Sequence, residues 1–435
     1  MANNERQFED DVFALMTEKL GWTARKNADF TRTVDKAMDL PVFVKFLKTS
    51  QPKAWARFEA ACEGEDAVET LYTKFENAVG TDGIVAVLKD GFRAKGVKFA
   101  AYFPKPENGL CDSGVEDYGK NVCHIVRQWH YSPHEPAKSV DLMLAVNGIP
   151  LCAIELKDPF TGQTVAQAKT QWMTDRNPKE DVFRLNHRCI VFFAVDLYEA
   201  WMTTKLEGGK SDFRPYNQGS EGAGNDGGAG NPKREDGNYV TAYLWEEVWQ
   251  RDKFLDILNK FLHFEKSKTV RMSDGRLVFP RYHQLDVVRK LVADARKRGA
   301  GKNYLIQHSA GSGKSNSIAW TAYRLASLHN DQDEPVFNSV VIVTDRVVLD
   351  RQLQATISSF DHVLGTVVTI NDEKSSKDLL KALNDGKRLI VTTLQKFPVI
   401  WEQVKGNKGK RYAVIVCRYG NRSKNFINLL LRIRC

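Results

Sequence analysis

The sequence predicts an α/β chain of two domains, the first with a mixed sheet and flanking helices and the second with a mainly parallel sheet. A chain of 435 residues is long enough for two domains that each bury a core. Short apolar, partly β-branched runs alternate with segments of helical periodicity. Glycine-rich and polar stretches interrupt this alternation and mark the boundaries.

Composition then divides the chain. The first domain is expected over residues 1–262. Within it, the glycine- and asparagine-rich segment 206–238 is predicted to be a mobile surface insertion. Residues 239–262 have apolar side chains at helical spacing and are predicted to be helices that bridge the domains. The second domain is expected over residues 277–416, followed by a basic tail at 417–435.

A β-hairpin is predicted in the first domain, because two apolar segments flank Asn147-Gly148, a strong turn signal. A two-residue loop would put Asp141 and Glu155 on opposite faces, since side chains alternate along a strand. A three-residue loop, with Gly148 in the left-handed region, sets Asp141 opposite Ala153 and gives it the same face as Glu155 and Lys157. We therefore predict the longer loop. The residues then expected to face a core are Leu142, Leu144, Ile154 and Leu156.

Two carboxylates on one face would suit Mg²⁺, which prefers oxygen ligands and retains several waters. Such an ion stabilises charge that develops on a phosphate and helps to generate an attacking hydroxide. Lys157 would orient that water or stabilise the phosphate oxygens. The alternative is a solvated sheet edge. Against it, Glu155 and Lys157 interrupt a strand that looks buried, and burying charges without a partner or metal is costly.

The segment VDLMLAVNGIPLCAIELKDPFTGQTVAQAKTQW resembles the nuclease segment of the restriction (R) subunit of type I restriction-modification enzymes. Those subunits carry a nuclease domain of the PD-(D/E)xK kind. By this resemblance, Asp141, Glu155 and Lys157 match the catalytic motif, with the two carboxylates as Mg²⁺ ligands. Gln171 falls where the family has a glutamine followed by an aromatic residue. That residue is Trp172 here, where a tyrosine is expected.

The resemblance also suggests that an acidic residue of the first helix, Glu9 or Glu5, supports the site. The alternative is that both lie on a solvated helix face. TDRNP and CIVFFAVD, farther along, resemble the same family.

A phosphate-binding loop is predicted in the second domain. NYLIQH reads as a short buried strand, a small flexible segment follows, and Lys314-Ser315 opens a helix. Glycines let the backbone approach phosphates, while Lys314 would reach the β- and γ-phosphates of ATP and Ser315 its Mg²⁺. His308 stands where the first glycine of G-x-x-x-x-G-K-S is usual, and the R subunits resemble this chain there too. The predicted ATP-binding residues are Gln284, Gly311, Ser312, Gly313, Lys314 and Ser315.

Further segments resemble the first motor domain of a superfamily 2 helicase. FPRYHQLDVVRKL resembles the segment whose glutamine reads the adenine edge, here Gln284; an ordinary N-terminal helix turn is the alternative. Hydroxyl groups and amides at strand ends suit contacts with the DNA backbone. The candidates in VVIVTDRVVLDRQL and RLIVTTLQKF are Thr344, Asp345, Arg346, Thr392, Thr393 and Gln395.

The chain departs from the family pattern after Val416. The strand GKRYAVIV should precede the motif Asp-Glu-Ala-His, whose carboxylates hold Mg²⁺ and activate water for ATP hydrolysis. CRYGNRSKNFINLLLRIRC follows instead, without an acidic residue and with five of the nine net positive charges. We expect a natural reading frame lost near Val416, a truncated motor domain, and loss of hydrolysis and translocation. A genuine divergent C-terminus is the alternative.

Seven scattered cysteines without a C-x-x-C pair favour reduced thiols over a zinc site. The polar N-terminus is no signal peptide, and no apolar run reaches membrane length. We therefore expect a soluble protein without a membrane partner.

The resemblance implies the restriction subunit of a type I system, cytoplasmic in a bacterium or archaeon. It implies Mg²⁺-dependent cleavage of double-stranded DNA, coupled to ATP-driven translocation in the full-length family, with methyltransferase (M) and specificity (S) subunits as partners. Two alternatives remain: a non-catalytic nucleotide-binding remnant, and a stand-alone DNA-repair nuclease with a vestigial ATP site.

Overall fold

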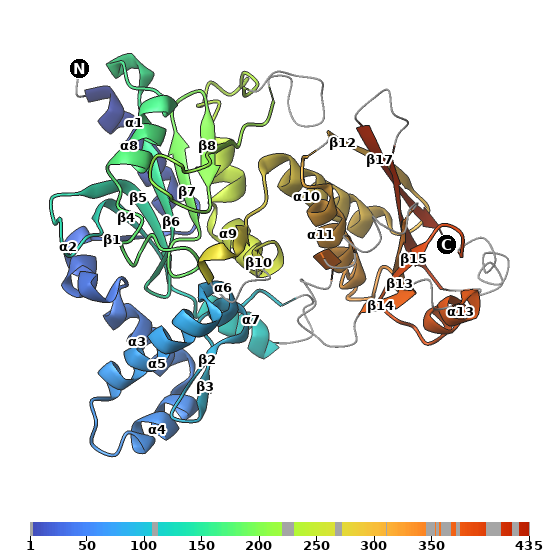
Figure 1. Cartoon of the computed structure of the whole chain (residues 1–435), viewed down its shortest axis with the longest axis horizontal. Coiled ribbons are helices and arrows are strands. Elements are labelled where there is room, and N and C mark those ends of the chain that lie inside the picture. Colours follow the sequence, from blue (N-terminus) through green and yellow to red (C-terminus); the bar gives the residue numbers. More distant parts are fainter. Residues whose placement is uncertain are drawn as a thin grey trace. The chain divides into compact units, whose positions relative to one another are not determined.

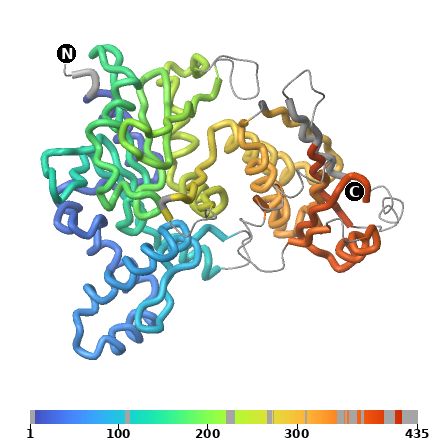
Figure 2. The backbone as a smooth tube through the Cα atoms, viewed as in Figure 1, coloured from blue at the N-terminus to red at the C-terminus, as the bar shows by residue number. Residues whose placement is uncertain are grey.

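The computed structural model describes residues 3–106, 112–219, 230–265, 272–309, 311–344, 353, 356–357, 367–370, 375–396, 410–419 and 426–434. The chain divides into two compact units, Met1–Pro106 with Cys111–Pro280, and Glu107–Leu110 with Arg281–Cys435 (Figure 1; backbone trace in Figure 2). The first unit extends to Pro280, past the expected start of the second domain at Leu277, because β11 (Arg276–Val278) pairs with β10 (His263–Glu265).

The first unit contains a seven-stranded sheet in the order β1-β4-β5-β6-β7-β8-β9. The pairs β1/β4 and β6/β7 are parallel and the others are antiparallel, so the sheet is mixed, as predicted. The strands are β1 (Thr23–Arg25), β4 (Cys123–His130), β5 (Ser139–Val146), β6 (Ile149–Leu156), β7 (Val191–Val195), β8 (Ala200–Thr203) and β9 (Arg214–Pro215).

Helices cover this sheet. Helix α1 (Asn3–Glu18) contacts β4 and β6, and α8 (Val165–Thr174) contacts β6, β7 and β8. Helix α8 begins with a capping box in which Thr164 and Gln167 satisfy each other's backbone amides. Trp172 of α8 is fully buried in an aromatic cluster with Phe183 and Phe192. The four residues predicted to face a core, Leu142, Leu144, Ile154 and Leu156, are all buried.

A helical lobe is inserted between β1 and β4, and it extends to one side of the sheet in Figure 1. Its aromatic core joins residues from several of these elements, including Phe43, Phe75, Phe92 and Phe99. Arg188, which is fully buried, ties the lobe down through Glu76 of α5. The lobe contains α3 (Leu40–Ser50), α4 (Pro52–Ala61), α5 (Ala67–Asp82), α6 (Ile84–Asp90), β2 (Phe92–Ala94) and β3 (Val97–Phe99).

Residues 206–238 were predicted to be a mobile surface insertion. This prediction is wrong for residues 206–219. Leu206, Phe213 and Tyr216 are buried, and β9 adds an edge strand to the sheet. Single apolar residues within this glycine- and asparagine-rich segment make the packing contacts. The average composition of the segment does not reveal them. The remaining elements of this unit are α2 (Asn27–Phe30), η1 (Thr31–Lys36), α7 (Asp112–Gly119), η2 (Pro159–Thr161), η3 (Leu244–Val248), α9 (Arg251–Lys260) and η4 (Met272–Asp274).

The second unit has a six-stranded sheet in the order β12-β17-β16-β13-β15-β14. The neighbours β16, β13, β15 and β14 are parallel, whereas β17 lies antiparallel between β12 and β16. The basic tail thus supplies β17, a strand that was not predicted. The strands are β12 (Asn303–Ser309), β13 (Ser339–Thr344), β14 (Val367–Ile370), β15 (Leu389–Thr393), β16 (Tyr412–Tyr419) and β17 (Phe426–Arg434), and the helices are α10 (Tyr282–Arg298), α11 (Lys314–Ala326) and α13 (Ser376–Asn384).

Among the described residues, no helix combines the length and apolar character needed to cross a bilayer. The five cysteines in the described part of the chain are buried thiols.

Candidate functional site

The turn between β5 and β6 has two residues, not the three predicted. Asn147 and Gly148 both have positive φ, 51° and 83°, and Val146 pairs with Ile149. This is the backbone pattern of a type I′ hairpin. A side chain at Gly148 would bring its Cβ within 2.4 Å of the Asp39 carbonyl oxygen, so the close approach requires glycine.

A bulge then corrects the register. Ala145 pairs with Pro150 but Leu144 pairs with Cys152, so β6 contains one extra residue there. Beyond the bulge, Leu142 pairs with Ile154, which places Asp141 opposite Glu155. The predicted partner of Asp141, Ala153, pairs with Met143 instead. The two carboxylates therefore share a face of the sheet. A bulge inside β6, rather than a bulged loop, brings this about.

The Asp141 carboxylate lies where β5 and β6 stop pairing. Its Oδ2 accepts a hydrogen bond from the Leu156 amide at 2.7 Å, and its Oδ1 accepts one from Gln128 Nε2 at 3.2 Å. Lys157 Nζ is 3.9 Å from Oδ2. The Asp141 carboxylate thus accepts from the Leu156 amide in place of a carbonyl oxygen of the strand. Donors from β4 and β6 set the orientation of the carboxylate.

Glu155 is completely buried. Its Oε1 accepts two hydrogen bonds from the guanidinium group of Arg176, which also donates to the Ser139 carbonyl oxygen at 2.6 Å. Its Oε2 has no hydrogen-bond partner. Burial, and next the charge of Asp141, raise the pKa of Glu155 well above its usual value, and Arg176 opposes this.

Lys157 is buried at the end of β6, and its amide donates to the Val195 carbonyl oxygen at 2.9 Å. Its side chain therefore reaches Asp141 from a backbone held by β7. Lys157 thus places a positive charge near Asp141, and the same charge lowers the pKa of Glu155.

Glu9 of α1 belongs to the same cluster. It is buried, so the expectation of a solvated helix face is wrong for this residue. Its Oε1 pairs with Arg127 Nε at 2.8 Å and its Oε2 accepts from Gln128 Nε2 at 2.9 Å. Burial raises the pKa of Glu9, the ion pair with Arg127 lowers it, and Asp141 raises it further.

The structure places Gln171 half-buried on α8. The hydrogen bonds described for Asp141 and Glu155 involve other residues. Trp172, where a tyrosine was expected, is a core residue whose indole nitrogen donates to the Phe193 carbonyl oxygen at 2.9 Å. The sequence analysis did not identify Gln128 or Arg176 as site residues. The one signal for Arg176 was the resemblance of TDRNP to the family.

The site suits a two-carboxylate magnesium ion. No group of three histidine, cysteine, aspartate or glutamate side chains in the described part of the chain could hold a metal. Mg²⁺ needs only one or two carboxylates when phosphate and water complete its shell. The buried Glu155 Oε2, without a partner and beside Asp141, is the oxygen that such an ion would satisfy.

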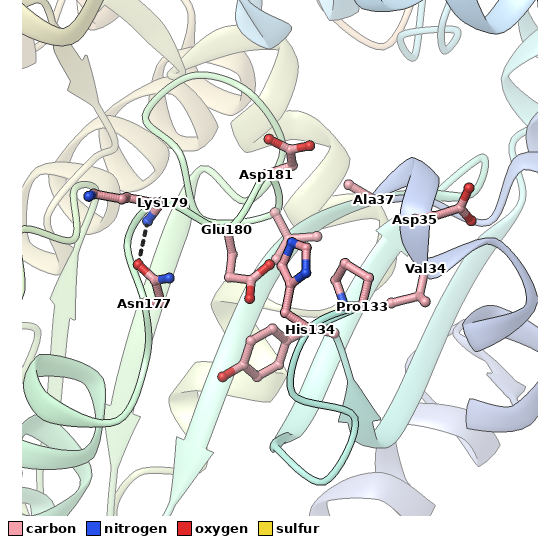
Figure 3. Close-up of a pocket in the computed structure, with 11 residues that line it drawn as sticks. Val34, Asp35, Ala37, Pro133, His134, Asn177, Lys179, Glu180 and Asp181 are labelled. Atoms are coloured by element: carbon pink, nitrogen blue, oxygen red, sulfur yellow. Dashed lines mark hydrogen bonds between the residues drawn. The ribbon is translucent and has the colours of Figure 1, made fainter.

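A cavity of about 180 Å³ adjoins the loop that follows Arg176 (Figure 3). Three carboxylates, of Asp35, Glu180 and Asp181, line it against the single lysine Lys179. Figure 3 shows Glu180 beside His134, and Glu180 accepts a hydrogen bond from Ser132. This acidic lining would repel a phosphate backbone.

The predicted phosphate loop joins β12 to α11. Gly311 and Gly313 have φ values of 73° and 79°, conformations that favour glycine. Lys314 opens the helix, its Nζ 3.5 Å from the His308 carbonyl oxygen, and burial lowers its pKa. Ser315 is half-buried in the first turn, and Ser312 is buried. The strand, loop and helix therefore follow in the order that phosphate binding requires.

Gln284 supports this loop from α10. It is buried, its Nε2 donates to the Gly313 carbonyl oxygen at 2.8 Å, and its Oε1 accepts from the Arg281 amide at 3.0 Å. Both ends of the amide group are thus engaged within the unit, rather than directed at a ligand. His283 and His308 also lie against the loop, near Ser312.

The candidate DNA contacts follow two adjacent strands. Thr344 ends β13 and pairs in register with Thr393, which ends β15. Thr344 and Thr393 are buried, as is Thr392, whose carbonyl oxygen accepts from Thr344 Oγ1 at 3.4 Å. Gln395 is exposed beyond β15. Asp345 and Arg346 lie outside the described residues.

Known proteins resemble both units. The family model described as type I restriction enzyme R protein N terminus matches residues 2–211, and the SWI2/SNF2 ATPase model matches residues 283–427. The HindI type I restriction enzyme endonuclease subunit of Haemophilus influenzae is 25% identical over 302 residues, which is 66% of this chain and 26% of that protein. The chain is therefore similar to type I restriction endonuclease subunits along most of its length.

A putative type I restriction endonuclease subunit of Methanocaldococcus jannaschii, MjaVIIIP, is also 25% identical, over 256 residues, 57% of this chain and 21% of that protein. The chain thus spans about a quarter of the length of these R subunits. The first family match contains the carboxylate cluster, and the second contains the phosphate loop.

Proposed function

We propose that the first unit is a Mg²⁺-dependent endonuclease that cleaves double-stranded DNA. Its catalytic residues would be Asp141, Glu155 and Lys157. One observation carries the proposal: a fully buried carboxylate oxygen, Glu155 Oε2, has no hydrogen-bond partner and lies beside a second carboxylate and a lysine. Leaving a buried charged oxygen unsatisfied costs free energy, and a bound cation would remove that cost. The match to the R-protein N terminus supports the same conclusion.

The residues have separable roles in this mechanism. Asp141 and Glu155 would hold the ion, which would supply Lewis-acid stabilisation of the charge that develops at the scissile phosphate. Arg176 fixes Glu155 through Oε1, which leaves Oε2 for the ion, and it opposes the rise in the pKa of Glu155 that burial causes. Lys157 would hold the attacking water or stabilise the extra negative charge on the phosphate oxygens. Gln171 stays a candidate for orienting DNA from α8.

We propose further that the second unit binds MgATP, with Lys314 on the phosphates and Ser315 on the ion. Cys417, Arg418 and Tyr419 follow Val416 at the positions where carboxylates that support ATP hydrolysis are expected, so the proposal for this unit is limited to nucleotide binding. The relatives' names place them in type I systems, and M and S subunits would then be the partners of this chain in the cytoplasm of a bacterium or archaeon. Of the predicted DNA contacts, the exposed Gln395 would touch the DNA backbone, whereas Thr344 and Thr393 are buried.

A non-catalytic remnant is a second candidate, and the Arg176–Glu155 ion pair favours it, because a buried pair can be purely structural.

Nicking of supercoiled plasmid in Mg²⁺ separates the two functions. We expect the wild type to nick, and Asp141→Ala and Lys157→Ala to lose at least about 100-fold in rate, the scale of losing a catalytic group. Asp175→Ala, an exposed acid at the end of α8, is the matched control and should retain the rate. Equal rates for all four proteins would reject the nuclease site.

A further inference from the structure

Gln128 stands out in β4. Its neighbours Arg127 and Trp129 pair with Leu142 and Val140, which sets Gln128 opposite Asp141. Gln128, Asp141 and Glu155 therefore form one row across three adjacent strands. Gln128 also has a φ of +44°, which a residue with a side chain rarely adopts inside a strand. Such strained backbone persists only where other interactions hold it, and it concentrates at functional sites.

The side chain of Gln128 is exposed, yet its amide group is fully engaged. Its Nε2 donates one hydrogen bond to Glu9 at 2.9 Å and another to Asp141 at 3.2 Å. Its Oε1 accepts from the Ser139 hydroxyl at 3.1 Å. An exposed glutamine would ordinarily be solvated and would sample several rotamers. Here contacts with α1 and β5 select one.

We propose that Gln128 is a positioning residue for the metal ligand Asp141, an inference that rests on the proposed nuclease function. The Leu156 amide holds one oxygen of Asp141, and Gln128 holds the other. With a donor on each oxygen, the carboxylate plane is fixed before an ion arrives. Partners that orient a metal ligand typically change metal affinity or activity by about 10- to 100-fold when they are removed.

The residue type fits this role. Glu9 and Asp141 both need a donor, so a glutamate at position 128 would add a third acceptor and a third negative charge. A lysine or arginine would supply donors, but its charge would compete with the cation that the site must attract. Arg127 already pairs with Glu9 from the other side. A neutral amide therefore orients both carboxylates without adding charge to the site.

Two variants test the proposal in the full chain. Gln128→Gly removes the amide and relieves the positive φ, so we expect an unchanged or higher melting temperature. Gln128→Glu keeps the shape but replaces the donor with an acceptor. For both variants we expect Mn²⁺ to bind the DNA-free protein about 10- to 100-fold more weakly by calorimetry. The Mg²⁺ concentration for half-maximal nicking should rise by a similar factor, with a much smaller loss of rate at saturating Mg²⁺.

Glu63→Gly is the matched control, because Glu63 is exposed and has a φ of +50° far from the site in sequence. It should leave Mn²⁺ binding unchanged. Wild-type Mn²⁺ affinity in Gln128→Gly and Gln128→Glu, with Asp141→Ala unable to bind, would overturn the role of Gln128 and leave the nuclease function standing. A wild type that neither binds Mn²⁺ nor nicks would overturn both. A rate loss at every Mg²⁺ concentration with unchanged affinity would also overturn the positioning role.

Discussion

The two candidate sites of this chain, the carboxylate cluster and the predicted phosphate loop, are built in different ways. The phosphate loop lies within a few residues between β12 and α11, and its supports come from one neighbouring helix, α10. The carboxylate cluster combines α1, β4, β5, β6 and the loop after α8. A local site depends on backbone conformation, whereas a dispersed site depends on buried charges that must be balanced over long distances in sequence. The two sites should therefore fail in different ways.

The largest effect is expected at the dispersed site. Arg176→Met should destabilise the first unit by about 3–5 kcal/mol, because it leaves the fully buried Glu155 charge without its partner. Denaturant unfolding near pH 7, followed by tryptophan fluorescence, measures this change. The double variant Glu155→Gln/Arg176→Met removes both charges and should recover most of the loss. An equal loss in the single and double variants would mean that packing, not charge, makes Arg176 important.

The second effect is a pH dependence of opposite sign in the two units. Burial raises the folded-state pKa of Glu155 above 4.5, so its contribution to stability is present at lower pH and is lost as pH rises through the folded value. Burial lowers the pKa of His308 from 6.5 to about 4, so its contribution is present above 6.5 and is lost as pH falls toward 4. Burial disfavours the charged form in both, but that form is the deprotonated acid in one and the protonated imidazole in the other.

Two variants isolate these effects. Glu155→Gln should flatten the fall in the stability of the first unit above pH 4.5. His308→Gln should remove roughly 2–4 kcal/mol of acid destabilisation from the second unit between pH 6.5 and 4. Hydrogen exchange resolved by segment measures both units in one chain. If the stability of both units changes in the same direction as pH rises from 4.5 to 6.5, burial does not control these two groups.

The same contrast explains what could be predicted from the sequence. The phosphate loop was readable because its strand, glycines and Lys314 are consecutive. Asp141 and Glu155 were found from spacing and their shared face was predicted, but from the wrong register, because Pro150 was not recognised as the sign of a bulge in β6. Gln128 and Arg176 were missed because their roles exist only once distant strands pair. Burial of Glu9 likewise depends on where α1 packs.

The smallest effect is expected at the phosphate loop. A Cβ at Gly313 would lie 2.6 Å from Gln284 Nε2, whereas a Cβ at Gly311 meets no atom within 4 Å. Both glycines have positive φ, so each alanine variant should cost about 1 kcal/mol in stability from backbone strain. Gly313→Ala should cost about 1 kcal/mol more, because it also displaces the Gln284 hydrogen bond.

Thermal unfolding and titration with a fluorescent ATP analogue measure this difference. Gly311→Ala is the matched control for strain alone. In the double variant Gln284→Ala/Gly313→Ala the displaced amide is absent, so the extra cost of Gly313→Ala should vanish. If Gly311→Ala weakens binding of the ATP analogue more than Gly313→Ala does, open space at position 311 is needed for the nucleotide itself. The loop would then be limited by access of the phosphates rather than by its support from α10.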